Sequence, residues 1–359
     1  MGIRKLYKFL SDFDLIKEYP NLTRYVTVRK RELNDNQKSV IIGIDFWLYA
    51  HKFTYSYGNM IIGFWNQIIK LLSHKIIPLY IYDGRPPQEK DSIIQQRQRN
   101  RTNLEIRLNN LCNEMLSDCN TDTNDVDHLE QLELQKLKLK KSIIHIKKSD
   151  IDTIKEFFDM LHIPYMNAIG EADALCAKLF KDGYITACLS DDMDMLALGC
   201  GRTIKFQDGK VLEFDLDYIL TRLDINYNQF VEMCLLFGCD YIRPAFKLDN
   251  IDSYNLIKTY GCIEDILQNA NHASLNKENE KCKPFINGYQ NAKNILILSS
   301  LNEKIPNDFN PMIDKELDPF LVLQYLKSYG HVNYVTENMK RILDSIEYVN
   351  FHISKKSFV

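Results

Sequence analysis

The stretch Val40-Ile41-Ile42-Gly43-Ile44 is short, apolar and rich in β-branched residues, without the alternation of apolar and polar residues that marks a half-exposed strand. Two further runs share these properties, Ile76 to Tyr82 and Ile185 to Leu189. Strands of this composition are buried on both faces, because helices cover them on either side. The three runs therefore predict the central strands of a parallel sheet.

Amphipathic segments lie between and around these runs. Apolar residues recur at three- and four-residue spacing in Met60 to Ser73, Asp150 to Leu161 and Glu171 to Asp182, which predicts helices. Strands that alternate with helices are typical of an α/β protein. The sequence thus predicts a doubly wound, mostly parallel sheet covered by helices.

Length and composition exclude several classes of protein. The 359 residues, 45% of them hydrophobic, are enough for one large core or a core with a small added lobe. Nine cysteines without a C-x-x-C pair fit neither a disulfide framework nor a zinc site, so we expect reduced thiols. No apolar run reaches the roughly 20 residues of a membrane span, and the start lacks a secretory signal, so we expect an intracellular protein without a membrane partner. Abundant Ile, Asn, Lys and Tyr are typical of an AT-rich genome, and nucleus, cytoplasm and a viral replication site all stay open.

The charge is distributed unevenly. A net charge of −3 argues at first against a nucleic-acid partner, because such binding depends on Lys and Arg at phosphates. However, six lysines and no acid lie between Lys136 and Lys148, and five arginines and a lysine face three acids between Arg85 and Arg107. These runs are also typical of solvated helix faces. Both interpretations stay open on charge alone.

The segment from Asp91 to Ser149 is long, polar and divided by turn-forming residues from Asp118 to Asp125. A structureless insert of this length is improbable in a compact domain, so we expect two helices joined by a loop. Beyond about Arg243 the sequence predicts a smaller helical region.

Acidic residues follow every predicted strand. The first run is followed by Asp45, the second by Asp83, and the third by Ser190-Asp191-Asp192-Met193-Asp194, while Gly170-Glu171-Ala172-Asp173 begins a predicted helix. The carboxyl ends of parallel strands meet at one edge of a sheet, where these side chains should converge. Any one of them could simply cap a helix. Together they indicate a site for hard divalent cations, Mg²⁺ or Mn²⁺, and two ions suit phosphodiester hydrolysis. An aspartyl-phosphate phosphatase would need a second Asp two residues after the first, and Asp45-Phe46-Trp47 lacks it.

Several motifs share one order along the first 270 or so residues. They are Met1-Gly2-Ile3, Ile44-Asp45, Tyr82-Asp83-Gly84-Arg85-Pro86-Pro87, Gly170-Glu171-Ala172-Asp173-Ala174, Asp191-Asp192-Met193-Asp194 and Gly238-Cys239-Asp240-Tyr241. In this order they resemble the flap endonuclease or XPG-type structure-specific 5′ nucleases. The resemblance implies a PIN-like nuclease core with a helical arch. It also implies seven metal-binding carboxylates: Asp45, Asp83, Glu171, Asp173, Asp192, Asp194 and Asp240. Asp191 stands where the family usually has Glu and is not counted as a ligand.

The resemblance implies roles for other residues as well. Lys90 and Arg97, seven residues apart, match the arch residues that contact the scissile phosphate. Gly2 would lie close to the DNA junction. His51 stands where flap endonucleases have a Tyr that stacks on a displaced base, and its surroundings look closer to the 5′ exonuclease branch. Flap endonuclease and 5′ exonuclease both stay open.

The chain departs from the family after Asp240. A helix-hairpin-helix motif has glycines there that hold a K⁺ ion, and this chain has Lys247 and Asp249 at those positions. Side chains at these positions count against a K⁺ site, although Lys247 could contact a phosphate directly. No recognisable peptide for docking on a sliding clamp follows, so we do not expect that partner.

These observations predict a nuclease core over residues 1–245, with an arch at about 88–149, and a helical, DNA-binding carboxy-terminal lobe over 246–359. The expected protein is a monomer. It would cut DNA at flaps, nicks, gaps or 5′ ends with two Mg²⁺ ions, for which Mn²⁺ can substitute. A catalytically silent DNA-junction binder or scaffold is the alternative.

Overall fold

The computed structural model describes residues 2–3, 5–33, 39–118, 126–244, 246–269, 282–313 and 315–354. Its centre is a seven-stranded sheet in the order β1-β7-β6-β5-β2-β3-β4. The strands are β1 Lys17–Tyr19, β2 Val40–Asp45, β3 Ile76–Tyr82, β4 Tyr165–Asn167, β5 Ala187–Leu189, β6 Arg202–Gln207 and β7 Lys210–Asp215. Only β7 runs against the others. The predicted mostly parallel α/β fold is confirmed.

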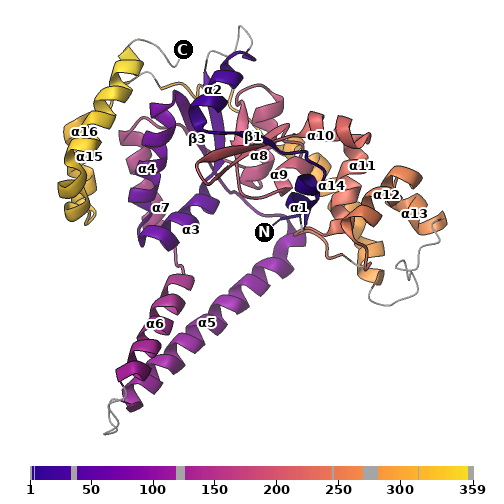
Figure 1. Ribbon diagram of the computed structural model, residues 1–359, viewed down its shortest axis with the longest axis horizontal. Coiled ribbons are helices and arrows are strands. Elements are labelled where there is room, and N and C mark those ends of the chain that lie inside the picture. The colour runs from indigo at the N-terminus through magenta and orange to yellow at the C-terminus, as the bar shows by residue number, and fades with distance from the viewer. Residues whose placement is uncertain are drawn as a thin grey trace.

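Helices surround the sheet (Figure 1). Those up to the middle of the chain are α1 Leu6–Asp12, α2 Leu22–Lys30, α3 Phe46–Tyr57, α4 Met60–Ser73, the 3₁₀ turn η1 Gln88–Lys90, α5 Asp91–Asp118, α6 Val126–Ser142, α7 Lys148–Met160 and α8 Ala172–Lys181. The later ones are α9 Asp194–Ala197, α10 Leu216–Leu223, α11 Tyr227–Phe237, α12 Asn250–Tyr260, α13 Ile263–Asn269, α14 Lys283–Asn302, α15 Pro319–Ser328 and α16 Val332–Ser354. No helix in the described ranges is both long and apolar enough to cross a membrane.

Strand β3 shows why the sheet is covered on both sides. All seven of its residues are buried, and neighbouring side chains point to opposite faces. Tyr80 stacks on Phe158 of α7, with ring centroids 4.5 Å apart, and meets Phe64 of α4. Ile81 points the other way, toward Gly43 of β2 and Cys176 of α8. Helices α4 and α7 therefore pack on one face and α8 on the other.

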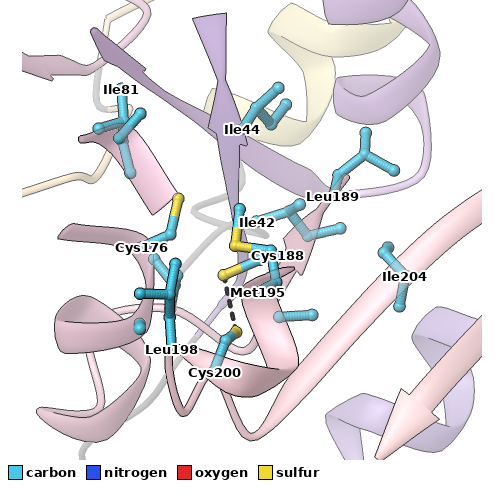
Figure 2. Packing of buried hydrophobic residues seen from close by; sticks show 14 of the residues in the cluster. Ile42, Ile44, Ile81, Cys176, Cys188, Leu189, Met195, Leu198, Cys200 and Ile204 are labelled. Atoms are coloured by element: carbon cyan, nitrogen blue, oxygen red, sulfur yellow. Dashed lines mark hydrogen bonds between the residues drawn. The ribbon is translucent and has the colours of Figure 1, made fainter. Parts of the chain in front are cut away.

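The core beneath the carboxyl ends of the strands is tightly packed. Figure 2 shows Ile42, Ile44 and Leu189 from the strands beside Cys176 and Cys188, whose side chains are fully buried. Cys200 lies with its Sγ atom 2.9 Å from that of Cys188. This packing holds β2, β5 and α8 together directly under the segment that contains Asp192 and Asp194.

Strands β6 and β7 were missed by the sequence interpretation. They form a hairpin in which Gln207 pairs with Lys210, and the two-residue turn Asp208-Gly209 has positive φ at both positions. An Asp-Gly turn between strands of alternating polarity is a strong hairpin signal, and it was available in the sequence.

Helices α5 and α6 project from the body of the molecule as an antiparallel pair (Figure 1). They confirm the two helices predicted between Asp91 and Ser149. The predicted joining loop, residues 119–125, lies outside the described residues.

The helices after α11 lie in two places. Helices α12 to α14 pack near α11 and α8, whereas α15 and α16 pack against α7 and α4 on the other side of the molecule (Figure 1). The proposed division into residues 1–245 and a DNA-binding lobe of 246–359 stays a prediction.

Candidate active site

Three neighbouring strands end at the same edge of the sheet. In the register of β2, β3 and β5, Asp45 pairs with Ile81 and Ile44 pairs with Leu189. Asp83 and the segment 190–194 therefore emerge beside Asp45. The sheet itself brings together acidic residues that are up to about 150 positions apart in the sequence.

Asp45 both ends β2 and begins α3. Its Oδ1 atom accepts hydrogen bonds from the backbone N–H groups of Trp47, at 2.8 Å, and Leu48. Burial and the neighbouring Asp83 raise the pKa of Asp45 to about 7, against the effect of these two hydrogen bonds. A single oxygen thus serves as a helix cap, which leaves the other oxygen for a ligand.

Asp83 is tied to the start of α8. Its Oδ1 atom accepts a hydrogen bond of 2.7 Å from the backbone N–H of Ala172. Gly84 follows, and an added Cβ there would lie 2.3 Å from the carbonyl oxygens of Ala168 and Ile169. Only glycine therefore allows the two backbone segments, and with them Asp83 and Glu171, to approach this closely.

Asp173, Asp192 and Asp194 lie beside one another in the cluster, and Asp194 is only 3% exposed. Burial and neighbouring carboxylates raise the pKa of Asp173 and Asp194 well above the usual range, and burial raises that of Asp192. Buried Oδ1 atoms of Asp173 and Asp194 have no hydrogen-bond partner among the described residues. Such oxygens are costly to bury, and a bound cation would satisfy them.

Glu171 is held between two side chains. Lys90 Nζ lies 2.5 Å from its Oε1 atom, and the Tyr241 hydroxyl donates to its Oε2 atom at 2.6 Å. The ammonium of Lys90 also lies 4.8 Å from the centre of the Tyr241 ring. Although burial lowers it, the pKa of Lys90 is raised overall by Glu171. Lys90 therefore supplies positive charge inside the cluster, and Tyr241 is a site residue that the sequence interpretation did not assign.

Arg97 and Asp240 join the arch to the core. An Arg97 nitrogen lies 2.5 Å from Asp240 Oδ2, and the preceding residue, Gln96, accepts a hydrogen bond of 3.0 Å from Arg243. Lys90 belongs to η1 and Arg97 to α5, so the two cations reach different carboxylates from consecutive elements.

Asp191 lies apart from this cluster. Its carboxylate pairs with Lys52 at 3.0 Å and with Lys205 at 3.8 Å. The structure therefore gives Asp191 surface partners, while Asp192 and Asp194 point into the buried group.

The remaining predicted residues come from three other segments of the chain. Gly2 touches Asp192, since an added Cβ would lie 1.7 Å from Asp192 Oδ1. His51 lies on α3, where partial burial and the charges of Arg101 and Arg97 lower its pKa. Lys247 is exposed in the segment before α12, and Asp249 caps that helix by accepting from Asp252 N at 2.7 Å.

The residues fit hard divalent cations by their chemistry. All the donors are carboxylate oxygens, which Mg²⁺ and Mn²⁺ prefer, and mutual repulsion among them calls for a counter-charge. As the side chains stand, no three His, Cys, Asp or Glu residues in the described ranges are grouped closely enough to enclose an ion. Lys90, bonded to Glu171 within the group, provides the counter-charge in this arrangement.

Comparison with known families gave two matches. Residues 1–104 match the XPG N-terminal domain, and residues 162–240 match the XPG I-region. Together these regions make up about half of the chain and include all seven carboxylates.

Curated relatives are flap endonucleases. The chain is 31% identical over 217 residues to flap endonuclease 1 of Brugia malayi, covering 59% of this chain and 53% of the relative. It is 32% identical over 229 residues to that of Entamoeba histolytica, covering 62% and 57%. The chain thus spans about half the length of the curated relatives it matches.

Solved structures share the fold. The catalytic core of Rad2 in complex with DNA substrate is 18% identical, with a TM-score of 0.64, and covers 96% of this chain and 99% of that one. Flap endonuclease-1 from Methanococcus jannaschii is also 18% identical, with a TM-score of 0.59 and coverage of 96% and 98%. At this identity the likeness shows the PIN-like nuclease fold and nothing finer.

Proposed function

Because the chain belongs to the flap endonuclease or XPG-type family, we propose that it is a structure-specific 5′ nuclease that hydrolyses DNA phosphodiesters at junctions of single and double strands. Its substrates are 5′ flaps, nicks, gaps or 5′ ends, and its products are a 5′-phosphate and a 3′-hydroxyl. One observation carries the proposal. Carboxylates from three strand ends and from the start of α8 come together at one edge of the sheet, with a lysine from the arch among them.

The cluster would hold two Mg²⁺ ions, for which Mn²⁺ can substitute, through Asp45, Asp83, Glu171, Asp173, Asp192, Asp194 and Asp240. When bound, two such ions stabilise the attacking and the leaving oxygen of an in-line displacement at phosphorus. The unpartnered oxygens of Asp173 and Asp194 support this assignment, because they need a cation or a proton.

The protein's own side chains orient the substrate. Lys90 and Arg97 can exchange their carboxylate partners for the scissile phosphate and stabilise the charge that develops there. Tyr241 holds Glu171 in place by donating to the carboxylate oxygen that Lys90 does not bind. Gly2, His51 and Lys247 are the candidate contacts for the DNA near the junction.

The proposed nuclease acts as a monomer. The solved neighbours include Rad2 bound to DNA substrate and human GEN1 bound to Holliday junction DNA. These complexes support DNA as the ligand class of the present chain.

The proposal is tested by cleavage of end-labelled flap, nicked, gapped and blunt duplexes with Mg²⁺. We expect cutting near the junction that stops with excess chelator. Asp192→Asn should abolish cleavage and preserve junction binding, because it removes a ligand and a negative charge near phosphate. Junction binding without cleavage by the wild type would instead favour a silent binder, and cleavage in excess chelator would exclude the metal mechanism.

A further inference from the structure

The loop that presents Glu171 is closed by a carboxylate from a distant part of the chain. Glu303, directly after α14, accepts hydrogen bonds from two consecutive backbone N–H groups: Ile169 N donates to Oε2 and Gly170 N to Oε1, both at 2.8 Å. The side chain of Glu303 is 4% exposed. It lies outside both regions matched by the family, residues 1–104 and 162–240.

These two bonds complete the backbone pairing of the loop. On the other side, Gly84 N donates to the carbonyl of Gly170 at 2.7 Å and Arg85 N to that of Ile169 at 3.0 Å. The N–H and the C=O of both Ile169 and Gly170 are thus bonded, and the peptide group between these two residues is held on both sides. A single carboxylate can offer one oxygen to each of two adjacent N–H donors.

Glu303 is itself held firmly. Helix α14 packs on α8, and Lys181 of α8 donates to Ser300 at 3.1 Å. Beyond Glu303, the ring of Phe309 packs against Tyr184, with centroids 5.8 Å apart. The carboxylate of Glu303 therefore connects a rigid helix end to the Glu171 loop.

We propose that Glu303 is a positioning residue of the active site, which sets the place of Glu171, and with it the start of α8, for metal binding. The inference rests on the proposed function for its catalytic consequence. The structural part of the proposal does not depend on that function. Without Glu303, the backbone N–H groups of Ile169 and Gly170 lose their acceptor, and Glu171 is free to shift.

Glu303→Gln and Glu303→Ala test the proposal. Gln keeps one acceptor oxygen and turns an amide NH₂ toward the other donor, so it disturbs the loop with little change in volume. Glu232→Gln is the matched control. Glu232 is also buried and accepts from a backbone N–H, that of Ile263, and from Lys293 Nζ at 2.5 Å, but it holds α11, α13 and α14 and not the site loop.

Three measurements separate the outcomes. Hydrogen exchange of the metal-free protein should be faster at Ile169 and Gly170 in both Glu303 variants and unchanged there in the control. Mn²⁺ titration followed by electron paramagnetic resonance should show affinity about 10-fold weaker or more, the range for loss of a residue that orients a metal ligand. Cleavage should need correspondingly more Mg²⁺, with DNA affinity in Ca²⁺ unchanged.

Faster exchange together with wild-type Mn²⁺ affinity would show that the role of Glu303 is purely structural and would overturn the proposal. Exchange at Ile169 and Gly170 that is unchanged from the wild type would overturn it as well. A lower melting temperature in all three variants with a metal defect only in the Glu303 variants would support it. If the wild type cleaves no DNA, the proposed nuclease function fails, while hydrogen exchange and Mn²⁺ binding still decide the role of Glu303.

Discussion

Gly2 illustrates how one missing Cβ controls a site. Its φ is +89°, and a Cβ at this position would lie 1.7 Å from Asp192 Oδ1 and 3.1 Å from Asp194 Oδ1. Both the backbone conformation and the space therefore require glycine. Any larger residue has to displace Asp192 or withdraw the amino-terminal segment from the cluster.

We expect Gly2→Ala to lower the single-turnover cleavage rate by about 10²-fold, since displacing a reacting group by roughly 1 Å can have that effect. Gly209→Ala is the control, because Gly209 also has positive φ, at +79°, but a Cβ there meets nothing within 4 Å. The control should lose some stability and keep its rate. Equal rates for Gly2→Ala and wild type would show that Gly2 does not position Asp192.

Asp45 predicts a pH dependence of stability in the metal-free protein. Its pKa is raised to about 7 by burial and by Asp83, so the folded protein binds the proton more tightly than the unfolded chain. The protonated carboxyl is favoured in the folded state, and stability falls as pH rises from about 4 toward 7.

Asp45→Asn should therefore raise the melting temperature of the metal-free protein more at pH 8 than at pH 5, and change it little at pH 3, because Asn keeps the capping oxygen and cannot ionise. A gain of about 2–4 °C corresponds to 1 kcal/mol in domains of 150–250 residues. Mg²⁺ should stabilise the wild type at pH 8 more than the variant. The same gain at both pH values would contradict the assignment.

At the scale of elements, η1 and α5 bring two cations to the cluster in different settings. Lys90 is 14% exposed and paired with Glu171, whereas Arg97 is 49% exposed and paired with Asp240. Lys138 and Lys140 lie exposed on α6, outside the cluster. The arch thus combines site cations with ordinary surface charge.

We expect Lys90→Ala and Arg97→Ala to lower the single-turnover rate far more than DNA affinity, by about 10²–10³, since a cation at the scissile phosphate acts on charge that develops in the transition state. Lys138→Ala and Lys140→Ala should weaken binding modestly and reduce its salt slope by about 1 each. If Lys90→Ala changed only the binding constant, the arch would be one undifferentiated basic surface.

The elements that sequence could predict are those whose signal is local. The apolar runs of β2 and β3 and the amphipathic pattern of α4 gave their positions within one residue. Strands β1 and β4 have three residues each and take their shape from pairing with β7 and β3, so no local pattern reveals them. The hairpin of β6 and β7 could have been found from Asp208-Gly209.

The residues of the site also divide into those with a signal in the sequence and those without one. Its acids follow strands, so parallel-sheet geometry predicts their convergence. The partners of these acids come from tertiary contacts: Tyr241 on Glu171 and Glu303 on the loop before it have no signal in the spacing of residues. Segments as distant as Gly2 and Glu303 meet around one cluster, which only the folded chain reveals.

At the scale of the whole molecule, charge is separated. The chain has a net charge of −3, with clustered carboxylates at the sheet edge and lysines on the projecting arch. The carboxylates repel phosphates that approach the cluster, while the arch attracts them. Monovalent salt and divalent cations should therefore act on DNA binding in opposite directions.

We expect affinity for a flap duplex, measured by fluorescence anisotropy at constant ionic strength, to rise when Ca²⁺ replaces part of the KCl, because a bound divalent cation reverses the repulsion at the cluster. With KCl alone, the logarithm of the DNA affinity should fall linearly with the logarithm of the KCl concentration, because binding displaces counterions from the DNA. Asp192→Asn should bind DNA more tightly than wild type without Ca²⁺ and gain less from it, because one repulsive charge and one ligand are already gone. Lys138→Ala should keep the full Ca²⁺ gain with a reduced KCl slope. Two results would contradict this expectation: DNA affinity in Ca²⁺ equal to that in KCl of the same ionic strength, or an equal gain from Ca²⁺ in wild type and Asp192→Asn. Either result would mean that phosphate does not approach these carboxylates and that the DNA lies on another face.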